Sequence, residues 1–209
     1  MKNFQILILI LFLTSCAVQS PTDKNNLKAM HKLSIEQEGQ RSRALYHQAL
    51  QQLREGHPEA SLIYEQAYAA ESRGEFENAI ELYHKAMQQA PENGLLLTSL
   101  GMVYLRNEDI IPARRYLLRA VGYDPDYFKP KLGLGYIYLQ NQQLDKAITQ
   151  LKASLQLLPT VEGTFLLAEA EQAQGDLTRA KQLYQAVVQV NKNSKLGKAA
   201  ATRLRSLSK

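Results

Sequence analysis

The sequence predicts an all-α fold in which a helix–turn–helix unit is repeated four times to form a superhelical solenoid. A pattern of small and large residues recurs at intervals of 34, 34 and 33 residues through the middle of the 209-residue chain. A period of this length is typical of stacked helical repeats. The hydrophobic content of 45%, with 22% charged residues, excludes a chain that is disordered throughout. The single Cys excludes an internal disulfide and a Cys-based zinc or iron–sulfur centre.

Residues 1–15 have the pattern of a secretory signal peptide. Lys2 precedes an unbroken apolar run at residues 6–13. This run is too short for a transmembrane helix, which needs about 20 apolar residues, but it has the length of a signal-peptide core. The run ends in Leu13-Thr14-Ser15-Cys16, which resembles the lipobox of bacterial lipoproteins.

The lipobox resemblance implies cleavage before Cys16, attachment of a diacylglycerol to its thiol, and acylation of its new amine with a fatty acid such as palmitate. Residues 16–33 would then be a lipidated Cys followed by a flexible, polar tether. An Asp after the Cys favours inner-membrane retention in enterobacteria-like systems, so Ala17 favours the outer membrane, facing the periplasm. The alternatives are an ordinary signal peptide with a chance Cys, or a buried free Cys.

Small residues recur at fixed positions in the two expected helices of each copy. The second helix of each copy carries an Ala, and a Pro ends the first three copies. Pro lacks an amide hydrogen and fixes φ, so it stops one helix and can open the next. The small positions are Ala67, Gly101 and Gly135 in the first helices and Ala79, Ala113, Ala147 and Ala180 in the second, and the prolines are Pro91, Pro125 and Pro159.

This pattern resembles the tetratricopeptide repeat over roughly residues 60–194. The chain departs from it at Glu108 and Gln142, which stand where the family has a turn Gly. Both residues can enter a left-handed conformation only at some energetic cost, so we expect these two turns to differ slightly from those at Gly. The resemblance implies an N-terminal half-repeat helix at 34–59 covering the first repeat, repeats at 60–93, 94–127, 128–160 and 161–194, and a basic capping helix at 195–209.

The resemblance also implies a concave groove, lined by the first helix of each repeat, that binds an extended or helical segment of a partner protein. Tyr and Arg are favoured at interfaces because they give large contacts at modest entropic cost. The alternative is that these aromatic residues pack between neighbouring helices. The expected groove residues are Tyr64, Tyr68, Met102, Arg106, Lys129, Tyr136, Gln140 and Phe165.

Signals of catalysis are weak in this sequence. Gly133-Leu134-Gly135 resembles the start of a dinucleotide loop, but no predicted strand precedes it and the third Gly is missing. The four His residues are scattered, without the i, i+4 pair of a helical zinc site. We therefore expect no catalytic residue, no metal ligand, no cofactor and no enzyme activity.

The C-terminal part of the chain is basic. No acidic residue follows Asp176, whereas eight basic residues do. This segment could contact anionic headgroups or an acidic partner, or it could be a solvated cap of the repeat array. Nucleic acid is not expected as a partner of an exported lipoprotein.

These observations predict a membrane-tethered adaptor that binds a partner protein in its groove and assists assembly of an envelope complex. Pilus or secretin, cell-wall and export machinery are all compatible, and the chain resembles small outer-membrane lipoproteins such as type IV pilus pilotins. The alternative is a structural, self-associating lipoprotein subunit. The partner's identity and the oligomeric state stay open.

Overall fold

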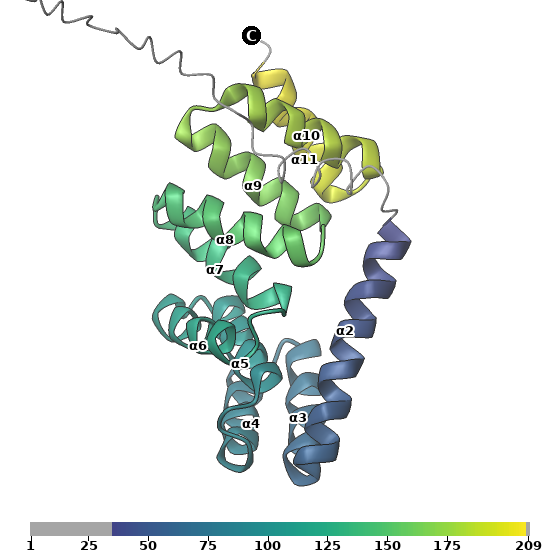
Figure 1. The fold of residues 1–209 in the computed structure, drawn as a ribbon, viewed down its shortest axis with the longest axis vertical. Helices are drawn as coiled ribbons and strands as arrows, with labels where there is room; N and C mark the ends of the chain where they lie inside the picture. The colour runs from purple at the N-terminus through teal and green to yellow at the C-terminus, as the bar shows by residue number, and fades with distance from the viewer. Residues whose placement is uncertain (1–34, 208–209) are drawn as a thin grey trace, which may run out of the picture.

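The computed structural model describes residues 35–207, which form ten α-helices and no strand (Figure 1). The predicted signal peptide, Cys16 and the tether lie outside the described residues. No helix within 35–207 combines the length and apolar character needed to cross a membrane. The helices are α2 (Ile35–Gly56), α3 (Pro58–Ser72), α4 (Phe76–Gln89), α5 (Gly94–Arg106), α6 (Ile110–Tyr123), α7 (Phe128–Gln140), α8 (Leu144–Leu157), α9 (Val161–Gln174), α10 (Leu177–Asn191) and α11 (Lys195–Ser206).

Helices α3 to α10 form four consecutive pairs, which confirms the predicted all-α solenoid. Each helix packs most extensively on its partner in the pair, and the second helix of each of the first three pairs also packs on the first helix of the next pair. Helix α11 packs against α10 and α9 at the C-terminal end of the stack (Figure 1). Arg203 of α11 donates a hydrogen bond of 2.9 Å to Glu169 of α9, which joins the basic last helix to the fourth repeat.

The predicted small residues lie where the paired helices cross. Ala79, Ala113, Ala147 and Ala180 are fully buried. A Cβ added to Gly101 would lie 2.7 Å from Leu117 Cγ, and one added to Gly135 would lie 2.5 Å from Leu151 Cγ. The axes of α5 and α6, and of α7 and α8, can approach this closely only because the first helix has no side chain there.

The outer and inner repeats fill the space beside these crossings in two different ways. In the first repeat the fully buried Tyr83 donates a hydrogen bond of 2.7 Å to Glu71. In the fourth, Tyr184 donates one of 2.9 Å to Gln172. The second and third repeats have Leu at both corresponding positions. Each repeat therefore has either both the Tyr hydroxyl and its acceptor or neither of them. This matching avoids a buried polar group without a partner. The inner pairs are Leu105 with Leu117 and Leu139 with Leu151.

The turns inside the four repeats share left-handed backbone geometry, including the two at which the sequence departs from Gly. Gly74 and Gly175 have φ of 80° and 97°. Glu108 and Gln142 occupy the same place in the second and third repeats with φ of 63° and 56°. A non-Gly residue in this region costs about 1–2 kcal/mol because its Cβ crowds the backbone.

Replacing these two strained residues with Gly is expected to stabilise the protein. Both side chains are exposed, so Glu108→Gly with Gln142→Gly removes backbone strain and loses little packing. The gain is partly offset by the greater freedom of Gly in the unfolded chain, which leaves about 1–2 kcal/mol for the pair. Denaturant unfolding followed by circular dichroism measures this change. The matched control is Gly74→Ala, which introduces the same strain without a steric clash and should lower stability; equal stability of all three chains would contradict the interpretation.

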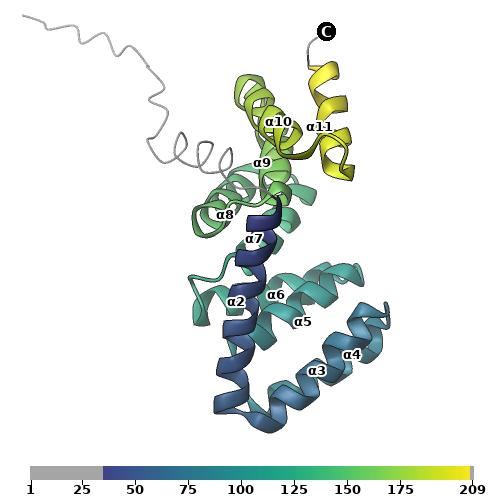
Figure 2. The same ribbon diagram turned by 90° about the vertical axis from the view of Figure 1, so that its right-hand side faces the viewer.

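Helix α2 does not simply stack on α3 as the expected half-repeat. Its C-terminal half packs on α3, where Leu53 is fully buried. Its N-terminal half continues along the side of the stack toward the start of α9 (Figure 1). After a rotation of 90° the same helix lies in front of the inner repeats (Figure 2). The N-terminal half of α2 follows this path because its contacts are with the groove and not with the next helix of a regular stack.

Candidate protein-binding groove

The concave side of the solenoid is built from α3, α5, α7 and the beginning of α9, and α2 lies along it. Tyr46 of α2 faces Tyr64 and Tyr68 of α3, with ring centroids 6.4 Å and 5.6 Å away. At the other end of the helix, Glu38 accepts a hydrogen bond of 3.1 Å from the Val161 amide at the start of α9. α2 therefore connects the first repeat to the fourth across the groove.

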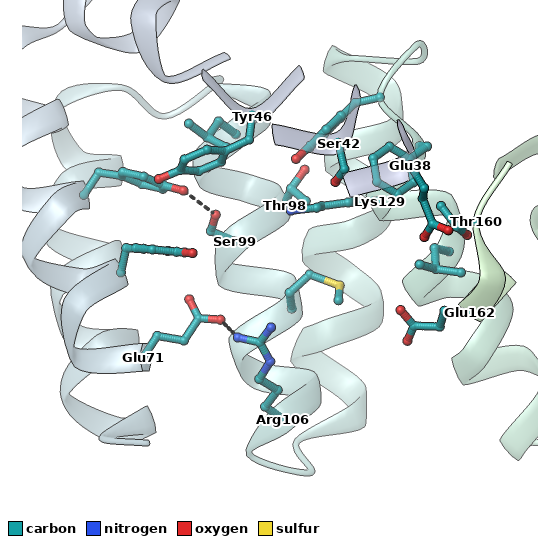
Figure 3. Close-up of a pocket in the computed structure, with 17 residues that line it drawn as sticks. Glu38, Ser42, Tyr46, Glu71, Thr98, Ser99, Arg106, Lys129, Thr160 and Glu162 are labelled. Atoms are coloured by element: carbon teal, nitrogen blue, oxygen red, sulfur yellow. Dashed lines mark hydrogen bonds and ion pairs between the residues drawn. The ribbon is translucent and has the colours of Figure 1, made fainter. Parts of the chain in front are cut away.

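A hollow of about 260 Å³ lies between α2 and the groove floor (Figure 3). We call it the covered hollow, because α2 forms its outer wall. Its lining mixes aromatic, hydroxyl and charged side chains contributed by every element that faces the groove. The residues are Glu38, Ser42, Tyr46, Tyr64, Tyr68, Glu71, Leu95, Thr98, Ser99, Met102, Arg106, Tyr127, Phe128, Lys129, Leu132, Thr160 and Glu162.

Aromatic rings form one end of the covered hollow. Tyr64 stacks on Tyr68 with ring centroids 6.4 Å apart. The hydroxyl of Tyr64 lies 3.2 Å from that of Ser99 on α5, and burial raises the pKa of Tyr64 well above its usual value. Lys129 of α7 places its ammonium 5.8 Å from the centroid of the Tyr46 ring, a cation–π arrangement that links α2 to the third repeat.

Two charged side chains, Lys129 of α7 and Glu38 of α2, are partly desolvated where α2 meets the groove. Burial lowers the pKa of Lys129, and the nearby Arg106 lowers it further. Burial likewise raises the pKa of Glu38, although the Val161 amide partly offsets this effect. Both shifts have the sign expected when desolvation penalises the charged form. Docking of α2 therefore carries an electrostatic cost alongside its apolar and hydrogen-bonding contacts.

Arg106 is tied to the core of the first repeat. Its guanidinium pairs with the carboxylate of Glu71, which is only 8% exposed and also accepts the hydrogen bond from Tyr83 (Figure 3). Arg106 itself is exposed on the groove side. The same side chain therefore neutralises a buried carboxylate and presents positive charge to the groove.

Beyond the edge of α2, the groove has a second hollow of about 300 Å³. We call it the open hollow, because no residue of α2 lines it. Its floor is mainly apolar and includes Gly133, where an added Cβ would lie 2.8 Å from Leu117 Cδ1, so α7 packs closely on the second repeat there. Arg106 and Glu162 supply one charge of each sign at its edges. The lining residues are Met102, Leu105, Arg106, Leu132, Gly133, Tyr136, Glu162 and Leu166.

The structure brings most of the expected groove residues to these two hollows. Tyr68, Met102, Arg106 and Lys129 line the covered hollow, and Tyr136, 36% exposed, lines the open one.

Three of the expected groove residues are placed differently. Tyr64 lines the covered hollow but is buried among other tyrosines. Gln140 is exposed at the end of α7 and lines neither hollow. Phe165 is half-buried, with its ring centroid 5.7 Å from that of Tyr184.

Sequence analysis missed the contribution of α2. Glu38, Ser42 and Tyr46 are spaced by four residues and so share one face of the helix. That spacing was visible in the sequence, but it did not indicate which surface the face would meet. Within residues 35–207, no three His, Cys, Asp or Glu side chains are grouped as a metal site would require.

Removal of Arg106 is expected to destabilise the first repeat. Arg106→Ala leaves the Glu71 carboxylate buried with Tyr83 as its remaining partner, and we expect a loss of about 1–2 kcal/mol, since exposure of Arg106 to water weakens the pair. Urea unfolding measures the difference. Arg73→Ala is the control, because Arg73 pairs with Glu75 at the surface. This substitution should leave the free energy of unfolding nearly unchanged. Equal effects of the two substitutions would contradict this role of Arg106.

Comparison with known proteins identifies repeats of one kind in this chain. Residues 98–162 and residues 164–194 each match a model of the tetratricopeptide repeat. Among curated proteins, the chain is 36% identical over 80 residues to the BBSome complex member BBS4 of Bos taurus. That alignment covers 38% of this chain and spans only 15% of the length of the bovine protein.

Solved structures of tetratricopeptide-repeat proteins share the architecture. YrrB, described as a TPR protein with an unusual peptide-binding site, has a TM-score of 0.59 at 20% identity, over 69% of this chain and 75% of its own. MamA from Desulfovibrio magneticus RS-1, from residue 41 to its end, has a TM-score of 0.60 at 17% identity, over 71% of this chain and 93% of its own. At these identities the likeness shows the fold alone.

Proposed function

We propose that this chain, which carries tetratricopeptide repeats, is an adaptor that binds a segment of a partner protein along its concave groove. The observation that carries the proposal is the groove itself, which accommodates a helix across its length and keeps an open apolar hollow beside it. The fold it shares with YrrB, which is described as having a peptide-binding site, supports the same function.

The open hollow supplies the features of an anchoring site. Met102, Leu132 and Leu166 form an apolar floor, and Tyr136 offers a partly exposed aromatic ring with a hydroxyl. An apolar side chain of the partner would lose water there, while Arg106 and Glu162 at the edge would select the polar groups beside it.

The proposal includes a lipid anchor at Cys16 that holds the adaptor at the outer membrane, facing the periplasm. Its support is the Leu13-Thr14-Ser15-Cys16 sequence after a short apolar run. Confinement to a surface raises the effective concentration of a partner, so a modest affinity in the groove would suffice. Assembly of an envelope complex, such as a pilus secretin, cell-wall or export machinery, would use this arrangement.

The anchor is tested by Cys16→Ser. The substitution removes the thiol that would carry the diacylglycerol, so we expect the protein to move from the membrane fraction to the soluble fraction of cells that process lipoproteins. Immunoblots of both fractions measure this change, with the unsubstituted chain as control. Equal membrane association of the two chains would contradict lipid anchoring.

The groove is tested by combining Tyr68→Ala, Met102→Ala and Tyr136→Ala. These substitutions remove contact surface from both hollows. Tyr68 and Tyr136 are exposed and Met102 is half-buried, so the circular dichroism spectrum and a cooperative melting curve should persist. Crosslinking in cells, followed by quantitative mass spectrometry, should show partner recovery reduced at least tenfold. The matched control is Ile111→Ala with Leu118→Ala, which removes apolar surface from α6 and should leave partner recovery unchanged.

The same control tests the alternative of a structural, self-associating subunit. Ile111 and Leu118 lie seven residues apart on α6 and are 79% and 49% exposed, so one outer face of this helix carries apolar surface. If the control pair disrupts crosslinked multimers and the groove variant does not, the structural alternative replaces the adaptor.

A further inference from the structure

The groove already holds an amphipathic helix of this chain. The face of α2 that meets the groove carries Glu38, Ser42, Leu45, Tyr46 and Leu53. Its contacts include a main-chain amide of α9, the rings of α3 and the ammonium of Lys129 on α7. These are the contacts of a helix bound in a groove, with apolar and aromatic anchors on one face and a polar group at each end.

The packing of α2 differs from that of the repeat helices. Among the side chains described in residues 37–56, only the hydrophobic Leu53 is fully buried, whereas Leu45, Tyr46, Ala49 and Leu50 are half-buried. The covered hollow of about 260 Å³ remains beneath it. Interfaces inside a stable core are close-packed, so an interface with this much unfilled volume is weaker than the crossings inside the repeats.

Charge also weakens the docked position. Lys129 and Glu38 are both partly desolvated when α2 covers the groove, and each would regain water if the helix left. Arg54 of α2 pairs with Glu65 of α3 at 2.6 Å, but both side chains are exposed, and such pairs contribute little.

The chain has a short joint where α2 meets the repeats. α2 ends at Gly56, and α3 begins at Pro58, leaving His57 between them. Pro58 has no amide hydrogen to continue the hydrogen bonding of α2, and Gly56 permits a wide range of backbone angles. Rotation at this joint would lift α2 from the groove while leaving the four repeats in place.

From these observations we infer that the concave face is a receptor for an amphipathic helix, that α2 is its internal occupant, and that a partner helix of the same pattern binds by displacing α2. This inference rests on the proposed function, because it specifies how a partner segment reaches the groove.

The contacts of α2 define the chemistry of the partner helix. It would carry a carboxylate near its N-terminal end to accept the Val161 amide, an aromatic residue eight positions later for the tyrosines and Lys129, and an aliphatic residue seven positions beyond that, as at Glu38, Tyr46 and Leu53. A side chain reaching past the edge of α2 would in addition enter the open hollow.

The experiment uses a fluorescent peptide with the sequence of residues 35–56 as the probe. Its binding to the full chain in detergent is measured by fluorescence anisotropy. In the unsubstituted chain, the attached α2 competes at high effective concentration and binding is weak. Tyr46→Ala loosens the attached helix and leaves the groove intact, so the probe should bind at least about tenfold more tightly.

Matched variants distinguish displacement of α2 from the groove from a general destabilisation of the repeats. Gln51 lies on the outer face of α2 and bonds to Glu55 of the same helix, so Gln51→Ala should bind the probe like the unsubstituted chain. Glu38→Ala, which removes the contact with Val161, should increase probe binding, and Lys129→Ala added to Tyr46→Ala should reduce it again. Melting curves of all variants show whether the repeats are intact.

Equal probe affinity in all variants, or no binding to any of them, would overturn the inference. A chain that is dimeric, with α2 crosslinked to the groove of a second copy, would also overturn it, because the occupant would then not be internal. This failure is distinct from failure of the proposed function. If the probe never binds but the triple groove variant still loses its partner, the adaptor function stands without displacement of α2.

Discussion

The close crossing of paired helices at small residues is the constraint on which the rest of the structure depends. At Gly101 and Gly135, a single added carbon would come within 2.7 Å and 2.5 Å of a buried Leu. This contact sets the distance between the two layers of helices, and stacking of identical crossings bends the array into a solenoid. The groove is a consequence of that curvature.

The groove and α2 have opposite requirements. A binding surface needs exposed aromatic and charged groups. In the absence of a partner, covering the aromatic groups protects the protein from nonspecific association. α2 contacts Tyr64 and Lys129, whereas Tyr68 and Tyr136 stay 47% and 36% exposed, so the surface is partly covered and partly open. The hollow beneath α2 and the desolvated Lys129 make this cover weaker than the repeats that carry it.

The sequence allowed the repeats to be predicted, because their contacts are local and periodic. The positions of Ala79 and Gly101 at the helix crossings followed from spacing, whereas the left-handed geometry at Glu108 and Gln142 did not. The path of α2 could not be predicted in this way, since its contact between Glu38 and Val161 joins residues 123 apart and belongs to no repeat. For the same reason the expected groove set omitted the face of α2 and included Tyr64, which is buried.

Hydrogen exchange of the backbone amides of α2 in the full chain tests the central claim most directly, because exchange reports the free energy of local opening. The account predicts intermediate protection: amides of α2 should exchange at least about tenfold more slowly than in the isolated peptide, and faster than those of α5 and α7. Exchange as fast as in the free peptide would mean that α2 does not occupy the groove. Exchange as slow as in α5 would mean that α2 is a permanent part of the core, and no partner helix could displace it.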